Sequence, residues 1–207
     1  MFHKVEKIEK MNGYNKNIDT QKEILKDILN LSENIDKVLK VSHSELDNYY
    51  IGAGCLVQTV WNYLSGNPLE YGIGDIDIVY YDAKDLCREK EEYIERKIVS
   101  LLGDIPFKVD VKNEARVHLW YEKKFGYSIE PYQSLEDAIN SWPTTATSLG
   151  VRKANNGEFK VYAPYGLNDL FNMIVRANKV QITREIYEKK VAKWTKFWPK
   201  LQVIPWD

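Results

Sequence analysis

Cysteine and histidine are scarce in this chain, which holds two cysteines and three histidines among 207 residues. Cys55 and Cys87 stand far apart, and neither belongs to a Cys-x-x-Cys motif or to a Cys/His cluster. A zinc site is therefore not expected. So few thiols without a disulfide framework are typical of a reducing compartment, and we expect a cytoplasmic protein.

Long hydrophobic runs are also missing. No apolar stretch reaches the roughly 18 residues that a transmembrane helix requires. The first ten residues, MFHKVEKIEK, lack the apolar core of a signal peptide. We therefore expect no association with a membrane.

The chain has no excess of positive charge. It contains 29 Lys and Arg against 30 Asp and Glu, which gives a net charge of −1. This balance argues against a protein that recruits long nucleic acid through a global basic field, although a local basic patch is compatible with it. Hydrophobic residues make up 44% of the sequence, enough for the core of one domain or of a domain with an appendage.

The first 48 residues predict helices. Asp19 and Thr20 offer an N-cap, and a second helical pattern covers about residues 33–41. Apolar residues recur at helical spacing after the cap, at Ile24, Leu25, Ile28 and Leu29. We expect residues 1–48 to pack as an N-terminal helical segment on a domain formed by residues 49–207.

Two carboxylates lie in a segment that predicts a β-strand. The run from Ile73 to Tyr81 is rich in β-branched and aromatic residues. Because side chains alternate along a strand, Asp75 and Asp77 point to the same face, roughly 7 Å apart at the backbone. Two carboxylates on one face repel each other unless a cation neutralises them, and a hard ion such as Mg²⁺, or Mn²⁺, prefers oxygen ligands.

A third carboxylate follows in the strand-like run Phe107 to Val111. Val109 and Val111 would face one side of the sheet and Asp110 the other. If this strand lies beside the first, Asp110 completes a cluster with Asp75 and Asp77. Three carboxylates suffice to hold two cations roughly 3.5–4 Å apart for in-line phosphoryl displacement.

A Gly-Ala-Gly turn precedes the acidic strand. It lies between a short predicted strand at Tyr49 to Ile51 and a predicted helix from Cys55 to Leu64 that ends at Ser65-Gly66. Gly52 and Gly54 allow tight or positive-φ backbone, and a helix that opens there presents free N–H groups to an anion. We expect Gly52, Ala53 and Gly54 to bind the phosphates of a nucleotide.

Polar residues also follow Asp110. Lys112, Arg116 and His118 are candidate nucleotide ligands, because lysine and arginine bind phosphate and histidine can transfer protons near neutral pH. The alternative for His118, a hydrogen-bonded structural role, is the more common one for a lone histidine. The nine residues 66–74, GNPLEYGIG, form either an active-site loop or a simple connector.

The C-terminal half combines turns with aromatic segments. Trp142 to Thr147 offers a tryptophan and three threonines, which either bind a nucleotide or fill the core. Asn155-Asn156-Gly157 predicts a hairpin, and we expect Arg152 in its first strand to face the site. A helix is expected over Thr183 to Trp198, with its tryptophans clamping it onto the core.

The order of these motifs resembles the polymerase-β-like nucleotidyltransferase superfamily, and six blocks resemble a bacterial nucleotidyltransferase-like family within it. The likeness runs from about Tyr49 to Trp206. The blocks are GAGCLVQTVWN, GDIDIVYYD, VDVKNEARVHLWY, SWPTTATSLGVR, YAPYGLNDLF and WPKLQVIPW. The resemblance implies an α+β fold, a mixed β-sheet flanked by helices with N- and C-terminal helical extensions.

The resemblance also implies a reaction, the transfer of a nucleoside monophosphate from an NTP to an acceptor with release of pyrophosphate. Asp75, Asp77 and Asp110 would be the catalytic and metal-binding residues. The acceptor is not indicated, and the neutral charge favours a small molecule or a protein over long nucleic acid. The alternatives are a non-catalytic module that binds a nucleotide or partner, and a metal-dependent phosphohydrolase.

Overall fold

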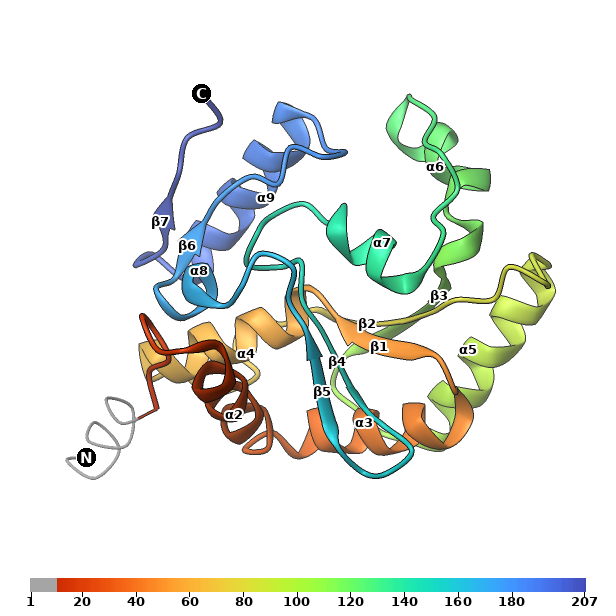
Figure 1. Cartoon of the computed structure of the whole chain (residues 1–207), viewed down its shortest axis with the longest axis horizontal. Helices are drawn as coiled ribbons and strands as arrows, with labels where there is room; N and C mark the ends of the chain where they lie inside the picture. Colours follow the sequence, from red (N-terminus) through yellow and green to blue (C-terminus); the bar gives the residue numbers. More distant parts are fainter. Residues whose placement is uncertain (1–10) are drawn as a thin grey trace.

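The structure is a computed structural model and describes residues 11–207. Its centre is a five-stranded sheet in the order β3-β2-β1-β4-β5 (Figure 1). The strands are β1 (Tyr49–Gly52), β2 (Asp75–Tyr80), β3 (Lys108–Asn113), β4 (Gly150–Lys153) and β5 (Phe159–Tyr162). β2 and β3 run parallel and the other neighbouring pairs antiparallel, so the sheet is mixed, as predicted.

Helices cover one face of this sheet. They are α2 (Ile18–Leu29), α3 (Glu33–Glu45), α4 (Gly54–Ser65) and α5 (Arg88–Leu102). Alternate residues of β1, β2 and β3 point into the main core beneath these helices, including Ile51, Ile76, Ile78 and Val111. The α2 helix packs on α4, and α3 and α5 contact the sheet.

Shorter elements stand on the other face. The helix α7 (Leu135–Asn140) packs on Tyr50 and Val79, and α6 (His118–Phe125) follows the 3-10 turn η1 (Glu114–Arg116). Figure 1 shows α6 and α9 (Arg184–Phe197) rising on either side of α7. This face therefore has room for a pocket, whereas the first face is filled by the core.

The C-terminal segment is tied to the core by aromatic rings. The ring of Trp61 in α4 contacts those of Trp194 and Trp198 edge-on, with centroids 5.7 and 5.6 Å apart. The indole N–H of Trp198 donates to Asn62 Oδ1 at 2.7 Å. These contacts confirm the predicted clamp. Next to it lie α8 (Asn168–Phe171) and the two parallel strands β6 (Ile174–Val175) and β7 (Gln202–Val203).

Two local predictions were wrong. Asn17, not Asp19, caps α2, because its Oδ1 accepts the backbone N–H of Thr20. The apolar spacing of residues 89–102 predicts a helix with Tyr93 and Leu101 facing inward, but in α5 these side chains are 60% and 51% exposed. The helix lies over the edge strand β3, so only a narrow stripe of it is covered.

The predicted hairpin is present, with Gly157 at φ 81° in its turn.

Within residues 11–207, no helix combines the length and the apolar character that crossing a membrane demands.

Candidate active site

Three carboxylates meet at one edge of the sheet. Because β2 and β3 are parallel neighbours, Asp77 lies directly opposite Asp110, and Asp75 shares the face of Asp77. One carboxylate oxygen from each of the three residues lies within 4.8 Å of the others. The prediction that Asp75, Asp77 and Asp110 lie together is confirmed, and their chemical roles stay predictions.

The electrostatics of this cluster favour a bound cation. Burial, followed by the negative charges of Asp75 and Asp110, raises the pKa of Asp77 to about 6. Carboxylate oxygens are the donors that a hard divalent cation prefers. The residues present therefore fit Mg²⁺ or Mn²⁺, since such an ion would relieve the repulsion that perturbs Asp77.

Two lysines flank Asp110. Lys108 Nζ lies 2.7 and 2.8 Å from the two oxygens of Asp110, and its side chain is 72% exposed. Lys112 Nζ lies 4.0 Å from Asp110 and 3.4 Å from Glu95. Because Lys108 is on the surface, it can swing away from Asp110 at little cost when a cation competes.

The Gly-Ala-Gly turn connects β1 to α4 beside these carboxylates. The positive φ that we expected at the glycines occurs instead at Ala53, with φ 53° and ψ −127°, a strained conformation for a residue with a side chain. Gly52 is needed for another reason, because a Cβ there would lie 2.2 Å from the ring of Trp142. The turn is therefore shaped by contact as well as by backbone freedom.

No side chain caps the first turn of α4. The N–H groups of a first helical turn have no carbonyl partner within the helix, and the helix dipole favours an anion near them. Ala53 lies next to this turn and lines the same pocket as Asp77. A phosphate bound here would thus contact the helix N-terminus and the acidic cluster together.

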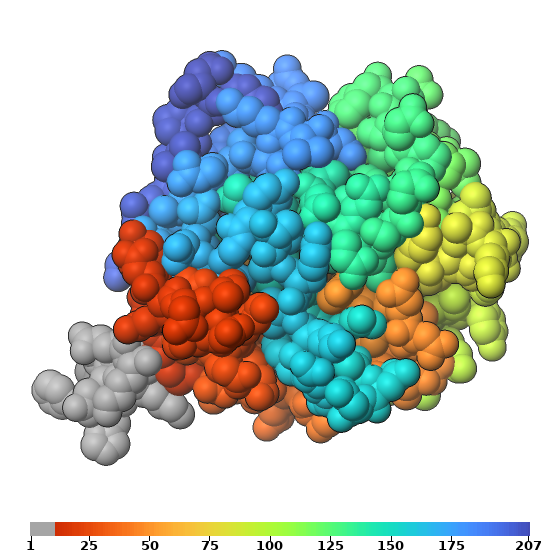
Figure 2. All heavy atoms as spheres, in the orientation of Figure 1, coloured from red at the N-terminus to blue at the C-terminus, as the bar shows by residue number. Residues whose placement is uncertain are grey.

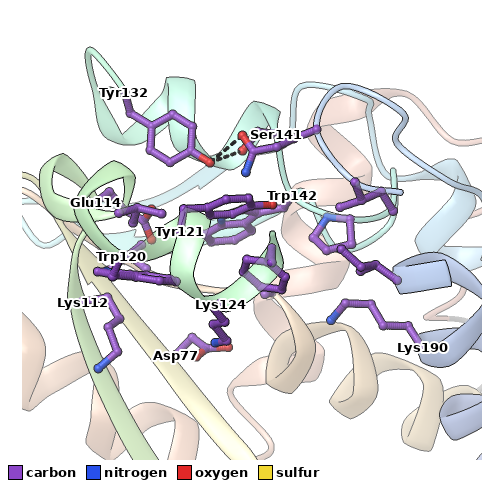
Figure 3. Close-up of a pocket in the computed structure, with 18 residues that line it drawn as sticks. Asp77, Lys112, Glu114, Trp120, Tyr121, Lys124, Tyr132, Ser141, Trp142 and Lys190 are labelled. Carbon is purple, nitrogen blue, oxygen red and sulfur yellow. Dashed lines mark hydrogen bonds between the residues drawn. The ribbon is translucent and has the colours of Figure 1, made fainter. Parts of the chain in front are cut away.

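A pocket of about 460 Å³ opens from Asp77 across the second face of the sheet (Figure 3). Its walls come from β2, β3, η1, α6, α9 and the segment that follows α7. In Figure 2 the α6 and α9 regions form separate lobes, green and blue. The volume is in the ordinary range of small-molecule sites. The residues that matter here are Ala53, Asp77, Lys112, Glu114, Trp120, Tyr121, Lys124, Tyr132, Ser141, Trp142, Gln181 and Lys190.

Three lysines bring positive charge to this pocket. Lys112 comes from β3, Lys124 from α6 and Lys190 from α9. Burial lowers the pKa of Lys190, while Asp77 opposes that shift. Lysines from three elements that converge beside an uncapped helix N-terminus suit a polyanion.

Aromatic rings form the rest of the wall. Trp120, Tyr121 and Trp142 line the pocket, and Lys124 Nζ lies 5.3 Å from the Trp120 ring centroid. The segment from Trp142 to Thr147 contributes to the pocket at one end and to the core at the other. Trp142 reaches the pocket, whereas the hydroxyls of Thr144 and Thr147 are buried and bond each other at 2.7 Å.

Two predicted nucleotide ligands do not reach the pocket. Arg116 is buried, its Nη1 2.6 Å from Glu91 Oε1 and its Nε donating to the Leu86 carbonyl. It anchors η1 to α5, so its prediction as a phosphate ligand was wrong. His118 begins α6 outside the pocket lining, and its buried Nδ1 forms no hydrogen bond within residues 11–207.

Arg152 also serves the structure, because its guanidinium lies over the ring of Tyr50 at 5.3 Å. Sequence reasoning missed Glu114, Lys124 and Lys190, which line the pocket from η1, α6 and α9. Lys124 and Lys190 look like solvated helix surface in the sequence, since nothing local shows that α6 and α9 face each other. Glu114 lies four residues after Asp110, and this proximity was the one available signal.

Comparison with known proteins places this geometry in a family. Residues 40–203 match the model of a family described as nucleotidyltransferase. This range is most of the chain, so the chain belongs to that nucleotidyltransferase family and is an enzyme of that class. No curated protein matches the sequence.

One solved structure shows the fold. A structure solved by NMR and described as a CCA-adding enzyme head domain is similar with a TM-score of 0.73 and 23% identity, covering 94% of this chain and 99% of that one. The predicted fold class is thereby confirmed. A tRNA nucleotidyltransferase in complex with a primer tRNA and an incoming ATP analogue matches with a TM-score of 0.39 and 13% identity, over 77% of this chain and 42% of that one.

Proposed function

We propose that this enzyme transfers a nucleoside monophosphate from an NTP to an acceptor hydroxyl or phosphate and releases pyrophosphate. In this step the acceptor oxygen bonds to the α-phosphorus, and the bond from that phosphorus to the pyrophosphate oxygen breaks. The observation that carries the proposal is the meeting of three carboxylates within 4.8 Å at the mouth of a lysine-lined pocket.

The three carboxylates would have different roles. Asp75 and Asp77 would hold two Mg²⁺ or Mn²⁺ ions, and Asp110 the ion on the acceptor side. A cation held there would neutralise charge that develops on the transferring phosphoryl group and orient the reactants. For a hydroxyl acceptor, Asp110 would accept the proton, because it would bind the cation on the acceptor side.

The turn and the lysines would bind the leaving pyrophosphate. The uncapped N-terminus of α4 at Gly52, Ala53 and Gly54 faces the β- and γ-phosphates, and Lys190 and Lys112 balance their charge. The rings of Trp120 and Trp142 would stack on the nucleoside. For the acceptor we favour a small molecule or a protein, since the net charge of −1 supplies no global basic field to recruit long nucleic acid.

The experiment uses α-labelled and γ-labelled ATP, GTP, CTP and UTP with Mg²⁺ or Mn²⁺ and a metabolite pool. Transfer predicts labelled pyrophosphate from the γ-label and an acceptor that carries the α-label. Both products should disappear in Asp77→Asn and persist in Asp82→Asn. Asp82 is a matched control, because it lies two residues beyond β2 and pairs with Lys90 outside the cluster.

Other outcomes would replace the proposal. Free nucleotide without a labelled acceptor would indicate the phosphohydrolase alternative. NTP binding without turnover would indicate a non-catalytic module. The metal role is tested separately by calorimetric titration of the protein with Mn²⁺ in the presence of a non-hydrolysable NTP. Unchanged Mn²⁺ binding in an Asp75→Ala/Asp77→Ala variant would contradict the proposed metal site.

A further inference from the structure

Glu114 is a buried acid with no partner. It begins η1 directly after β3, is 7% exposed and lines the pocket. Its carboxyl group forms no hydrogen bond or ion pair with any residue in the described part of the chain, 11–207. Its carboxyl oxygens are not sealed in the core but open on the pocket, so a ligand that enters the pocket is the natural partner for them.

The neighbouring charges do not neutralise Glu114. Arg116 is paired with Glu91, and Lys112 with Glu95 and Asp110. Burial, together with the negative charges of Asp77 and Glu91, raises the pKa of Glu114 to about 8. The group is therefore poorly suited to accept a phosphate and well suited to a hydrogen bond with a neutral ligand group.

Glu114 lies away from the carboxylate cluster. Asp110 pairs with Asp77 in the sheet, and β3 continues three residues to Asn113, roughly 10 Å beyond the level of Asp77, before the turn η1 begins at Glu114. Figure 3 shows Trp120 between Glu114 and Asp77 in this view, with Trp142 and Tyr121 beside them. The part of a nucleotide that reaches Glu114 is thus not the reacting phosphate, but the group that packs among aromatic rings.

We infer that Glu114 binds the hydrogen-bonding edge of the nucleobase and thereby selects among NTPs. This inference rests on the proposed function. Every base carries an amino or imino N–H on this edge, which a carboxyl oxygen accepts. With the triphosphate held at Ala53 and Lys190, the aromatic rings between the two ends would orient the base towards Glu114. A site built on such a bond rejects an analogue that leaves its buried group unpaired.

The test measures the affinities of the wild type, Glu114→Leu and Glu114→Gln for the four NTPs and for inorganic triphosphate, with Mn²⁺ present. The wild type should prefer at least one NTP. Glu114→Leu should bind that NTP at least about tenfold more weakly and lose the preference, while it binds inorganic triphosphate as before. Glu114→Gln keeps the shape but adds donors, so it should fold normally and change the order of preference.

The control is Glu122→Gln, on the exposed surface of α6 outside the pocket, which should behave like the wild type. Normal triphosphate binding with an unchanged NTP preference in both Glu114 variants would overturn the inference alone. Equal weakening of NTP and inorganic triphosphate would overturn it too, since that pattern indicates a general electrostatic effect. A wild type that binds neither ligand would overturn the proposed function together with the inference.

Discussion

The two faces of β2 differ in what they contribute. Ile76 and Ile78 point into the core and are fully buried, while Asp75 and Asp77 point to the opposite face and meet Asp110. The same strand thus supplies packing on one side and a cluster of repelling charges on the other. Because side chains alternate with a period of two, neighbouring residues can serve stability and chemistry separately.

The largest expected effect is on activity, at the acidic face. Asp77→Asn removes a ligand from the proposed metal site, and we expect transfer to fall by at least about 10²-fold, since metal ions contribute several kcal/mol to phosphoryl transfer. The labelled-NTP assay measures this loss. Thermal unfolding at pH 8 should show equal or greater stability, because the variant lacks a buried carboxylate whose ionisation is disfavoured. A strongly destabilised Asp77→Asn variant would show that the acidic face also contributes to stability, and would contradict the separation of the two faces.

The apolar face should respond in the opposite way. Ile78→Ala removes a fully buried side chain from the main core, and the free energy of unfolding should fall by about 2–5 kcal/mol. Urea unfolding measures this change, with Ile78→Val as a milder control at about 0.5–1.5 kcal/mol. Activity per folded molecule should remain. A loss of activity without a loss of stability would show that the two faces are not independent.

The division between the faces also explains what the sequence revealed. The β-branched and aromatic run at residues 73–81 and the strand-like run at residues 107–111 predicted the strands, and period-two alternation predicted the shared face of Asp75 and Asp77 and the companion Asp110. These features depend on local patterns, and the parallel pairing of β2 and β3 accompanies the crossover through the helix α5 between them. The Gly-Ala-Gly turn was located correctly for the same reason, although its positive φ belongs to Ala53.

Residues supplied by distant segments could not be predicted in this way. Lys124 and Lys190 lie on helices whose sequences resemble ordinary exposed surface, and only the tertiary fold brings them to one pocket. For Arg116 the error was the opposite one, because the sequence suggested a pocket residue that the fold places elsewhere. Its position near Asp110 suggested a phosphate ligand, but Glu91 of α5 lies close enough to pair with it. Buried arginines require a partner, and a single sequence does not show which partner the fold provides.

The pH dependence of stability tests Glu114, a buried acid on the pocket side of the sheet. Its pKa is raised from 4.5 to about 8 by burial, so the folded protein keeps a proton that the unfolded chain releases. Stability from this group is complete below about pH 4.5 and is lost as pH rises through about 8. Urea unfolding at pH 6.5 and 8.5 should show a loss on the order of a few kcal/mol in the wild type and a smaller one in Glu114→Gln. Parallel pH profiles for the two proteins would contradict the assignment.

The smallest expected effect distinguishes the two glycines of the turn. An added Cβ at Gly52 would lie 2.2 Å from Trp142 Cη2, whereas one at Gly54 would meet only Gln58 Nε2, at 3.2 Å. Gly52→Ala must therefore displace the indole that walls the pocket, and overpacking of this kind costs about 1–3 kcal/mol. NTP affinity should fall as well, because Trp142 moves.

Gly54→Ala is the matched control, since the side chain of Gln58 is flexible and Gly54 is the first residue of α4. Its free energy of unfolding should stay close to that of the wild type. Its NTP affinity should fall less than that of Gly52→Ala, because alanine keeps the backbone N–H that faces the phosphates. Chemical unfolding, combined with NTP titration followed by tryptophan fluorescence, compares the two variants. If Gly54→Ala proved the more harmful, the turn would depend on close backbone approach of a ligand at α4 rather than on the contact between Gly52 and Trp142.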